Sequence, residues 1–272
     1  MFPMFERSIL QTGRNFTKGT TPFLIILLAL TASISITYGS AFASTDTANS
    51  KPTKITIAQC QRRISHRFSK QVVAQAYRHI GIKVAFTEMP CRRSIDLANR
   101  GTYDGEVGKI PGTSSSFSNL IAVESPVFMI EGVAFTKSVS RKIASWDDLQ
   151  GLKIGIVSGQ LFAEQGTKGM GPVIVSDFNQ LVSLLAIDRI DIGIGLLQDY
   201  QLMKASEIPK GQEIHIVGQP LFTAPLFHLI HKKHKLLVPS LTDTLNAMWK
   251  SGETAEIHRQ TLEKLKKNPD AD

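Results

Sequence analysis

An alternation of β-rich runs with helical segments runs along most of this 272-residue chain, and it constrains the fold more than any other feature. In its first part, in chain order, we expect a strand over 54–59, a helix through Phe68, Val72 and Ala76 ending at Gly81, a strand over 82–86, a helix with Ser94 as N-cap, and a strand over 103–107. Strands separated by helices predict a parallel sheet with right-handed crossovers.

The alternation restarts after an extended run over 127–136. Here the expected elements are a capped turn at 145–148, strands over 153–157, 172–175, 191–197 and 213–217, and helices beginning near 158–160, 177 and 199. The C-terminal quarter differs, with an extended run over 226–231, a helix stopped by Gly252 and a final helix over 253–267 whose acids come first and lysines last. Two alternating sets predict two α/β lobes, each a mainly parallel sheet flanked by helices.

The N-terminal segment predicts export. Residues 22–36 are nearly all apolar or small, basic residues precede them, and Ala41 and Ala43 form a small-x-small cleavage site. We expect a signal peptide over residues 1–43 with cleavage after Ala43, and a flexible leader over 44–51. The alternative is a retained membrane anchor, which the shortness of the apolar run disfavours. The mature chain is therefore expected in the periplasm.

Both cysteines, Cys60 and Cys91, belong to the exported part. An even pair in an oxidising compartment predicts one disulfide. The two residues follow strands that are expected to be neighbours, about 4.8 Å apart. Two unpaired buried thiols are the alternative.

Other chemistry has weaker signals. The formal net charge is +8, but no Lys/Arg run is interleaved with aromatic residues, so no nucleic-acid partner is expected. His231 and His234 have ligand-like spacing, yet we expect neither a metal nor another cofactor. Glu88, Glu106 and Glu131 could act as a general acid or base, but no nucleophile–base pair is recognisable. The chain is therefore expected not to be an enzyme.

Several short motifs in a fixed order carry a family resemblance. They are Pro90-Cys91-Arg92-Arg93-Ser94, Asn99-Arg100-Gly101, Tyr103-Asp104-Gly105-Glu106, Ser145-Trp146-Asp147-Asp148-Leu149, Asp188-Arg189-Ile190-Asp191 and the stretch from His231 to Pro239. Together they make residues 52–265 resemble the extracytoplasmic solute-binding proteins of family 3, a family that serves amino-acid importers. The resemblance implies two lobes joined by two hinge strands, with the ligand in the cleft between them.

This resemblance also implies the domain boundaries and the site. Lobe one is expected over residues 52–137, ending in the first hinge strand, and over 222–268, which begin with the second; lobe two is expected over 138–221. Ligands of open parallel sheets bind outside the carboxyl ends of the strands, and helix N-termini there favour anions. The expected ligand-binding residues are Gln61, Arg62, Arg92, Arg93, Glu106 and Lys109 of lobe one, with Ser158, Gly159 and Gln160 of lobe two. Among them, Arg93 is expected to hold an acidic group of the ligand, and a solvated rim is the alternative place for the arginines.

Two departures from the family narrow the expected ligand. Ser116 and Leu196 stand where amino-acid binders of the family carry an arginine for the carboxylate and an aspartate for the ammonium group. An ordinary α-amino acid is therefore not the expected ligand. We expect a monomer that captures a small polar, anionic solute and delivers it to an inner-membrane importer. The alternatives are a binding module for a membrane sensor receptor and a periplasmic lyase resembling cyclohexadienyl dehydratase.

Overall fold

The computed structural model describes residues 51–61, 63–203 and 213–269. The predicted signal peptide, its cleavage site and Arg62 lie outside the described residues. No helix in the described ranges is long and apolar enough to cross a membrane.

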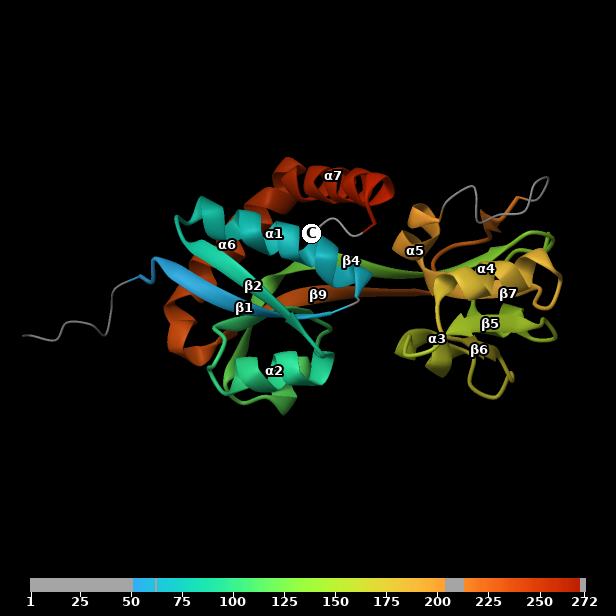
Figure 1. Ribbon diagram of the computed structural model, residues 1–272, viewed down its shortest axis with the longest axis horizontal. Helices are drawn as coiled ribbons and strands as arrows, with labels where there is room; N and C mark the ends of the chain where they lie inside the picture. Colours follow the sequence, from blue (N-terminus) through green and yellow to red (C-terminus); the bar gives the residue numbers. More distant parts are fainter. Residues whose placement is uncertain (1–50, 62, 204–212, 270–272) are drawn as a thin grey trace, which may run out of the picture. The chain divides into compact units, whose positions relative to one another are not determined.

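Nine strands in the described part of the chain form one sheet in the order β2-β1-β3-β9-β4-β7-β5-β6, with β8 paired to β4 (Figure 1). In chain order the strands are β1 Lys54–Cys60, β2 Lys83–Met89, β3 Gly105–Lys109, β4 Leu120–Thr136, β5 Ile154–Val157, β6 Val173–Val175, β7 Ile192–Leu196, β8 His215–Ile216 and β9 Phe222–His231. The strands β1, β2 and β3 are parallel and form a first strand set, while β5, β6 and β7 form a second parallel set. The long strands β4 and β9 pair antiparallel with each other and stand between the two sets in the sheet.

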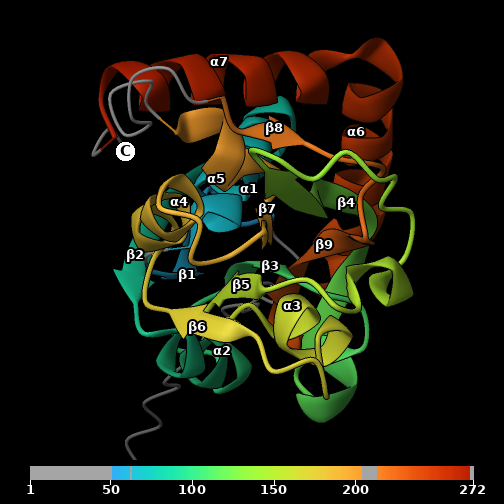
Figure 2. The ribbon, with the colours of Figure 1, turned by 90° about the vertical axis from the view of Figure 1, so that its right-hand side faces the viewer.

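Helices cover both strand sets. The α-helices are α1 Ile64–His79, α2 Cys91–Asn99, α3 Leu161–Gly166, α4 Phe178–Ala186, α5 Leu197–Leu202, α6 Val238–Ser251 and α7 Glu253–Lys267; 3₁₀ turns occupy Thr113–Ser116, Trp146–Leu149 and Lys232–Leu237. Figure 1 shows α1 and α2 on opposite sides of β1 and β2. In Figure 2, β5 lies between α3 and α4. The mixed α/β class predicted from the alternation is confirmed.

The buried core divides along β4. Val127 and Phe128 pack into a cluster formed with α1, α6 and α7, whereas Val133 and Phe135 pack into a cluster formed with α4. Ala134 points to the other face, where it joins Ala163 of α3 in a third cluster. Because side chains alternate along a strand, one long strand supplies several separate cores.

Most predicted elements are confirmed, including a last helix that runs over the expected residues 253–267. The N-cap predicted at Ser94 is wrong. Helix α2 begins at Cys91 with Pro90 as its N-cap, and the Ser94 N–H already closes the first turn onto the Pro90 carbonyl at 3.0 Å. Proline fits this place because its fixed φ suits entry into a helix. As a result, Ser94 is buried inside the helix, where its hydroxyl donates to the Cys91 carbonyl at 2.9 Å.

Asp104 ties the first strand set to the C-terminal part of the chain. Its carboxylate accepts hydrogen bonds from the Thr56 N–H at 2.7 Å and from His234 Nε2 at 2.8 Å, and pairs with Lys233 Nζ at 2.7 Å. Burial raises the pKa of this carboxyl, but the Lys233, His234 and Thr56 donors outweigh burial and hold the pKa at about 2. Asp104 therefore has a structural role, and His234 is one of its partners.

Candidate functional site

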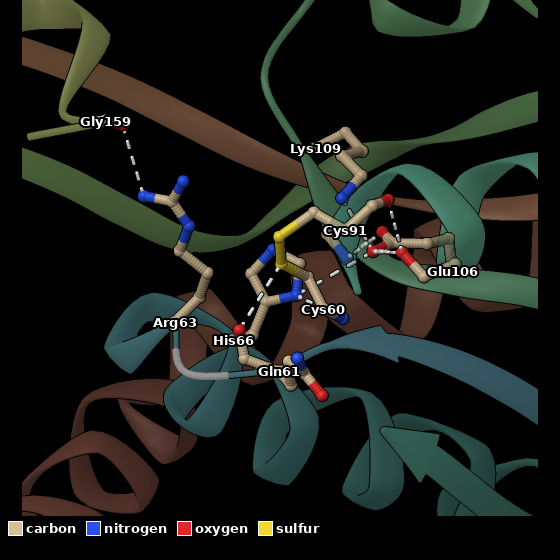
Figure 3. The surroundings of a disulfide bond; sticks show 10 residues. Cys60, Gln61, Arg63, His66, Cys91, Glu106, Lys109 and Gly159 are labelled. Atoms are coloured by element: carbon tan, nitrogen blue, oxygen red, sulfur yellow. Dashed lines mark hydrogen bonds and ion pairs between the residues drawn. A yellow bond between two sulfur atoms is a disulfide. The ribbon is translucent and has the colours of Figure 1, made fainter. Parts of the chain in front are cut away.

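The predicted disulfide is confirmed. Cys60 at the end of β1 is bonded to Cys91 at the start of α2, with the two Cα atoms 4.3 Å apart (Figure 3). Strands β1 and β2 are parallel neighbours, and Cys60 lies opposite Met89, two residues before Cys91. The bond therefore fastens together the two loops at the carboxyl ends of these strands. A disulfide agrees with an extracytoplasmic protein.

A buried carboxylate lies behind this disulfide. Glu106 in β3 has no exposed surface and accepts hydrogen bonds from the Gly108 N–H at 2.9 Å and the Ser94 hydroxyl at 3.3 Å. Lys109 Nζ pairs with its Oε1 at 2.8 Å, and the Lys109 side chain is only 16% exposed. Burial raises the pKa of the Glu106 carboxyl, while Lys109 and the other donors oppose that rise. The structure thus brings together two of the predicted site residues, Glu106 and Lys109.

His66 belongs to the same cluster and was missed from the sequence. Its Nδ1 accepts a hydrogen bond from the Cys60 N–H at 3.3 Å and lies 3.7 Å from Glu106 Oε1. Burial, with Lys109 and Arg63 nearby, lowers the pKa of His66 well below its usual value, so the imidazole is neutral and does not form an ion pair with Glu106. The signal for its burial is its place in α1, three and seven residues before the buried Ser69 and Val73.

His228 in β9 is a second buried imidazole next to Glu106. Its Nδ1 donates to the Glu106 carbonyl at 2.8 Å, and its Nε2 accepts from the Tyr77 hydroxyl at 2.9 Å. These two bonds fix the neutral tautomer. Burial lowers the pKa of His228 to about 4.

His228 is expected to make the fold sensitive to mild acid. The imidazole of His228 takes up a proton near its ordinary pKa of 6.5 in the unfolded chain, but only near 4 in the folded chain. The contribution of His228 to the unfolding free energy is therefore complete above pH 6.5 and is lost as the pH falls from 6.5 to 4. From pH 7 to 5 this group lowers the unfolding free energy by about 2 kcal/mol. Urea unfolding of wild type and His228→Gln at both pH values measures it, and the variant's loss should be smaller by that amount. Equal losses in both proteins would contradict the prediction.

The other predicted residues of the first set that the structure describes are Gln61, Arg92 and Arg93, and all three are exposed. Arg92 is 83% exposed and pairs with Asp96 of its own helix at 3.0 Å. Because α2 begins at Cys91, Arg93 is the third residue of the helix and does not precede it. Its contact with an acidic ligand group stays a prediction.

In the second set, the loop over 158–160 already uses the N–H groups of Ser158 and Gly159 and the side-chain amide of Gln160 within the chain. The Ser158 N–H donates to the Val175 carbonyl at 2.9 Å, and the Gly159 N–H donates to Glu164 Oε1 at 2.7 Å. Gln160 is 9% exposed, and its Nε2 donates to Asp199 Oδ2 at 3.2 Å. Asp199 was missed from the sequence, and burial raises the pKa of its carboxyl to about 6.

Arg63 joins the two strand sets. It is the N-cap of α1, directly after the disulfide loop, and its Nη1 donates to the Gly159 carbonyl at 3.4 Å (Figure 3). The positive charge of Arg63 opposes the rise that burial causes in the pKa of Asp199 and adds to the fall that burial causes in the pKa of His66. The guanidinium therefore acts electrostatically on residues of both sets. Loops at the carboxyl ends of both parallel sets therefore meet at this arginine, and we take this junction as the candidate site.

A separate hollow of about 270 Å³ lies between α1 and α7. Its lining includes Arg67, Arg78 and Lys264 but none of the junction residues. Arg67 donates to the Pro269 carbonyl, so the C-terminal end of the described chain lies against this hollow. Nothing in it resembles the buried carboxylates of the junction. In the described chain, no group of three or more His, Cys, Asp or Glu side chains is arranged to hold a metal ion.

Comparison with known proteins supports the fold assignment. No family model matches the chain. An uncharacterised protein of Shewanella oneidensis is 27% identical over 198 residues, which cover 68% of this chain and 72% of that protein.

Solved structures match over most of their length. Substrate-binding domain 2 of GlnP from Lactococcus lactis, in its open conformation, aligns with a TM-score of 0.61 at 18% identity and covers 79% of this chain and 98% of its own. An arginine transport system periplasmic binding protein from Legionella pneumophila aligns with a TM-score of 0.54 at 15% identity, over 76% and 99% of the two chains. A histidine kinase sensor domain with similarity to periplasmic binding proteins aligns with a TM-score of 0.56 at 13% identity, over 78% and 96%. The chain therefore has the fold of the periplasmic solute-binding proteins and is structurally similar to those of family 3.

Proposed function

We propose that the protein captures a small polar solute by closing two lobes around it. Lobe one is residues 52–137 and 222–268, lobe two is residues 138–221, and β4 and β9 are the hinge strands. The observation that carries the proposal is the contact between Arg63 and Gly159, because it joins loops at the carboxyl ends of both parallel sets. Such strand ends are where open α/β sheets bind ligands.

Closure follows from a shift in populations. A solute that contacts both lobes has more contacts in the closed form than in the open one, so it stabilises the closed form by that difference in affinity. Arg63 at the junction and Lys109 in the neighbouring Glu106 cluster are the donors of lobe one to which an acidic group of the solute binds in this proposal. Gln61, Arg62, Arg92 and Arg93 are further candidates at the rim.

The downstream partner is proposed from the neighbours. One of the matched proteins is described as the periplasmic binding protein of an arginine transport system, one as a substrate-binding domain, and one as the sensor domain of a histidine kinase. Delivery to an inner-membrane importer is the first proposal, and presentation to a sensor receptor is the second. A permease encoded beside the gene would favour the importer. The matched proteins are binding proteins, which favours binding over catalysis; product formation from prephenate-like acids would favour a lyase.

A solute screen tests the proposal. Protein stripped of solute by unfolding and refolding is screened by thermal shift against organic acids, amino acids, amines and sugars, since a ligand that binds only the folded state raises the Tm. Calorimetry and small-angle scattering should then show saturable binding and a smaller radius of gyration for at least one compound. A binder that leaves the radius unchanged would contradict closure, and a screen without any binder would contradict solute capture.

Once an acidic solute is found, Arg93→Ala is compared with Arg259→Ala. Arg259 is an exposed arginine of α7 that pairs with Glu256 and is not among the candidate residues, so it is the matched control. A loss of about tenfold or more in Arg93→Ala alone would support the predicted contact with an acidic group. Binding within about threefold of the parent would make Arg93 a rim residue.

A further inference from the structure

The loop of lobe two at the junction presents acceptors. The N–H groups of Ser158 and Gly159 and the side-chain amide of Gln160 all donate within lobe two. The acceptors that these bonds leave on the loop are the Gly159 carbonyl and the Gln160 amide oxygen, beside the Ser158 hydroxyl, which can donate or accept. A binding site built from such groups suits a ligand that brings donors.

Gln160 and Asp199 orient each other. A carboxylate only accepts hydrogen bonds, so the Gln160 nitrogen must face Asp199. This assigns the positions of the nitrogen and the oxygen of the Gln160 amide. The amide oxygen on the same carbon is buried and has no donor among the described residues. Because Gln160 is only 9% exposed, an acceptor without a donor there destabilises the fold unless one arrives. This oxygen is the observation, independent of the carboxylate, that points to a ligand.

A cation of the chain itself already contacts one of these acceptors. Arg63 Nη1 donates to the Gly159 carbonyl at 3.4 Å, and its charge acts on Asp199. Arg63 is exposed and comes from lobe one, so it can withdraw without disturbing a core. Its guanidinium thus indicates the chemistry that the lobe-two acceptors accommodate.

We propose that Asp199, the Gln160 amide oxygen and the Gly159 carbonyl form a cation-accepting subsite, which a guanidinium or ammonium group of the solute fills on binding and whose Gly159 carbonyl Arg63 contacts in this structure. The inference rests on the proposed solute-binding function and names the chemistry of one end of the solute. It leaves the donors of lobe one for any acidic group. The solute exchanges with Arg63, because both cations use the Gly159 carbonyl and lie in the field of the same carboxylate.

Binding of simple cations tests the subsite. Agmatine and putrescine carry cationic groups without a carboxylate, and succinate and citrate carry the opposite charge. Calorimetry with wild type should detect agmatine or putrescine. Asp199→Asn removes the charge but keeps the shape, and it should weaken that binding by about tenfold or more. Asp147→Asn removes the same charge from an exposed position of lobe two and serves as the matched control, with unchanged binding.

Arg63→Gln tests the competition. Removing the resident cation should tighten agmatine or putrescine binding by several-fold, and it should also raise the pKa of Asp199, measured by carbon NMR of labelled aspartate and assigned with Asp199→Asn. An unchanged pKa would overturn the placement of Arg63 in the subsite. This arm needs no ligand, so it separates the subsite from the wider function.

The remaining outcomes distinguish the two proposals. Succinate or citrate binding to wild type and Asp199→Asn alike, with no cation bound, would overturn the subsite and leave solute capture standing. No binding by any compound of the wider screen would overturn solute capture itself. Cation binding that Asp199→Asn does not weaken would place the cation elsewhere and overturn the subsite.

Discussion

Loss of the Cys60–Cys91 disulfide is expected to lower the free energy of unfolding by about 3–4 kcal/mol. The bond closes a loop with a sequence separation of 31 residues, and the chain-entropy account of cross-linking gives this size for such a loop. The protein has two cysteines in all, so a reducing agent acts on this one bond. Urea unfolding of the oxidised and the reduced protein measures the difference directly.

The double variant Cys60→Ser/Cys91→Ser is the control for reduction. It should be as unstable as the reduced wild type, and a reducing agent should not change it further. A difference below about 1 kcal/mol between oxidised and reduced wild type would show that neighbouring strand pairing already restrains the unfolded chain. Reduction should also loosen the loop before α1, because Arg63 follows Cys60 by only three residues.

The sequence predicted the elements whose signal is local. The last helix was located correctly for two reasons. Gly252, with a left-handed φ of 81°, ends the preceding helix α6, and the acids and lysines that follow match the dipole of α7. The disulfide was predicted because two strands separated by one helix are usually neighbours in a parallel sheet. Neither inference needed tertiary contacts.

The start of α2 was misjudged because two residues compete for the N-cap. Serine is a common N-cap, and its place before an apolar run favoured Ser94. Pro90 ends the preceding extended segment equally well and starts the helix one turn earlier. The choice depends on the burial of Ser94 against Glu106, which no local pattern reveals.

Asp199 and His66 were missed for a different reason. Both lie in helices whose patterns look ordinary, and their significance comes from residues far away in the chain. Asp199 is oriented by Gln160, and His66 by the Cys60 N–H at the end of β1. The hydrogen bond from the Gly159 N–H to Glu164 has a local signal. An acidic residue in the first turn of a helix often accepts from N–H groups at the start of that helix. That signal would have shown that the Gly159 N–H is engaged.

Glu106→Ala is expected to lower the free energy of unfolding by about 3–5 kcal/mol, the range for removing one partner of a buried ion pair. The substitution leaves the Lys109 ammonium group, which is largely buried, without its carboxylate at 2.8 Å. It also removes the acceptor for the Gly108 N–H, and a buried donor left without a partner destabilises the fold further; the Ser94 hydroxyl keeps the Cys91 carbonyl.

Two further variants separate the charge from the hydrogen bonds. Glu106→Gln keeps an oxygen for the Gly108 N–H but removes the charge and the acceptor that faces Lys109, so it should be less damaging than Glu106→Ala. Lys109→Met leaves the carboxylate buried without its cation, which burial already disfavours, as the raised pKa of Glu106 indicates. Because removal of both charges leaves neither ion unpaired, Glu106→Gln/Lys109→Met should be more stable than the sum of the single losses predicts, by about 1 kcal/mol or more in a double-mutant cycle from urea unfolding. Additive losses would mean that the two side chains do not depend on each other, and Lys109 would then be free to serve the solute alone.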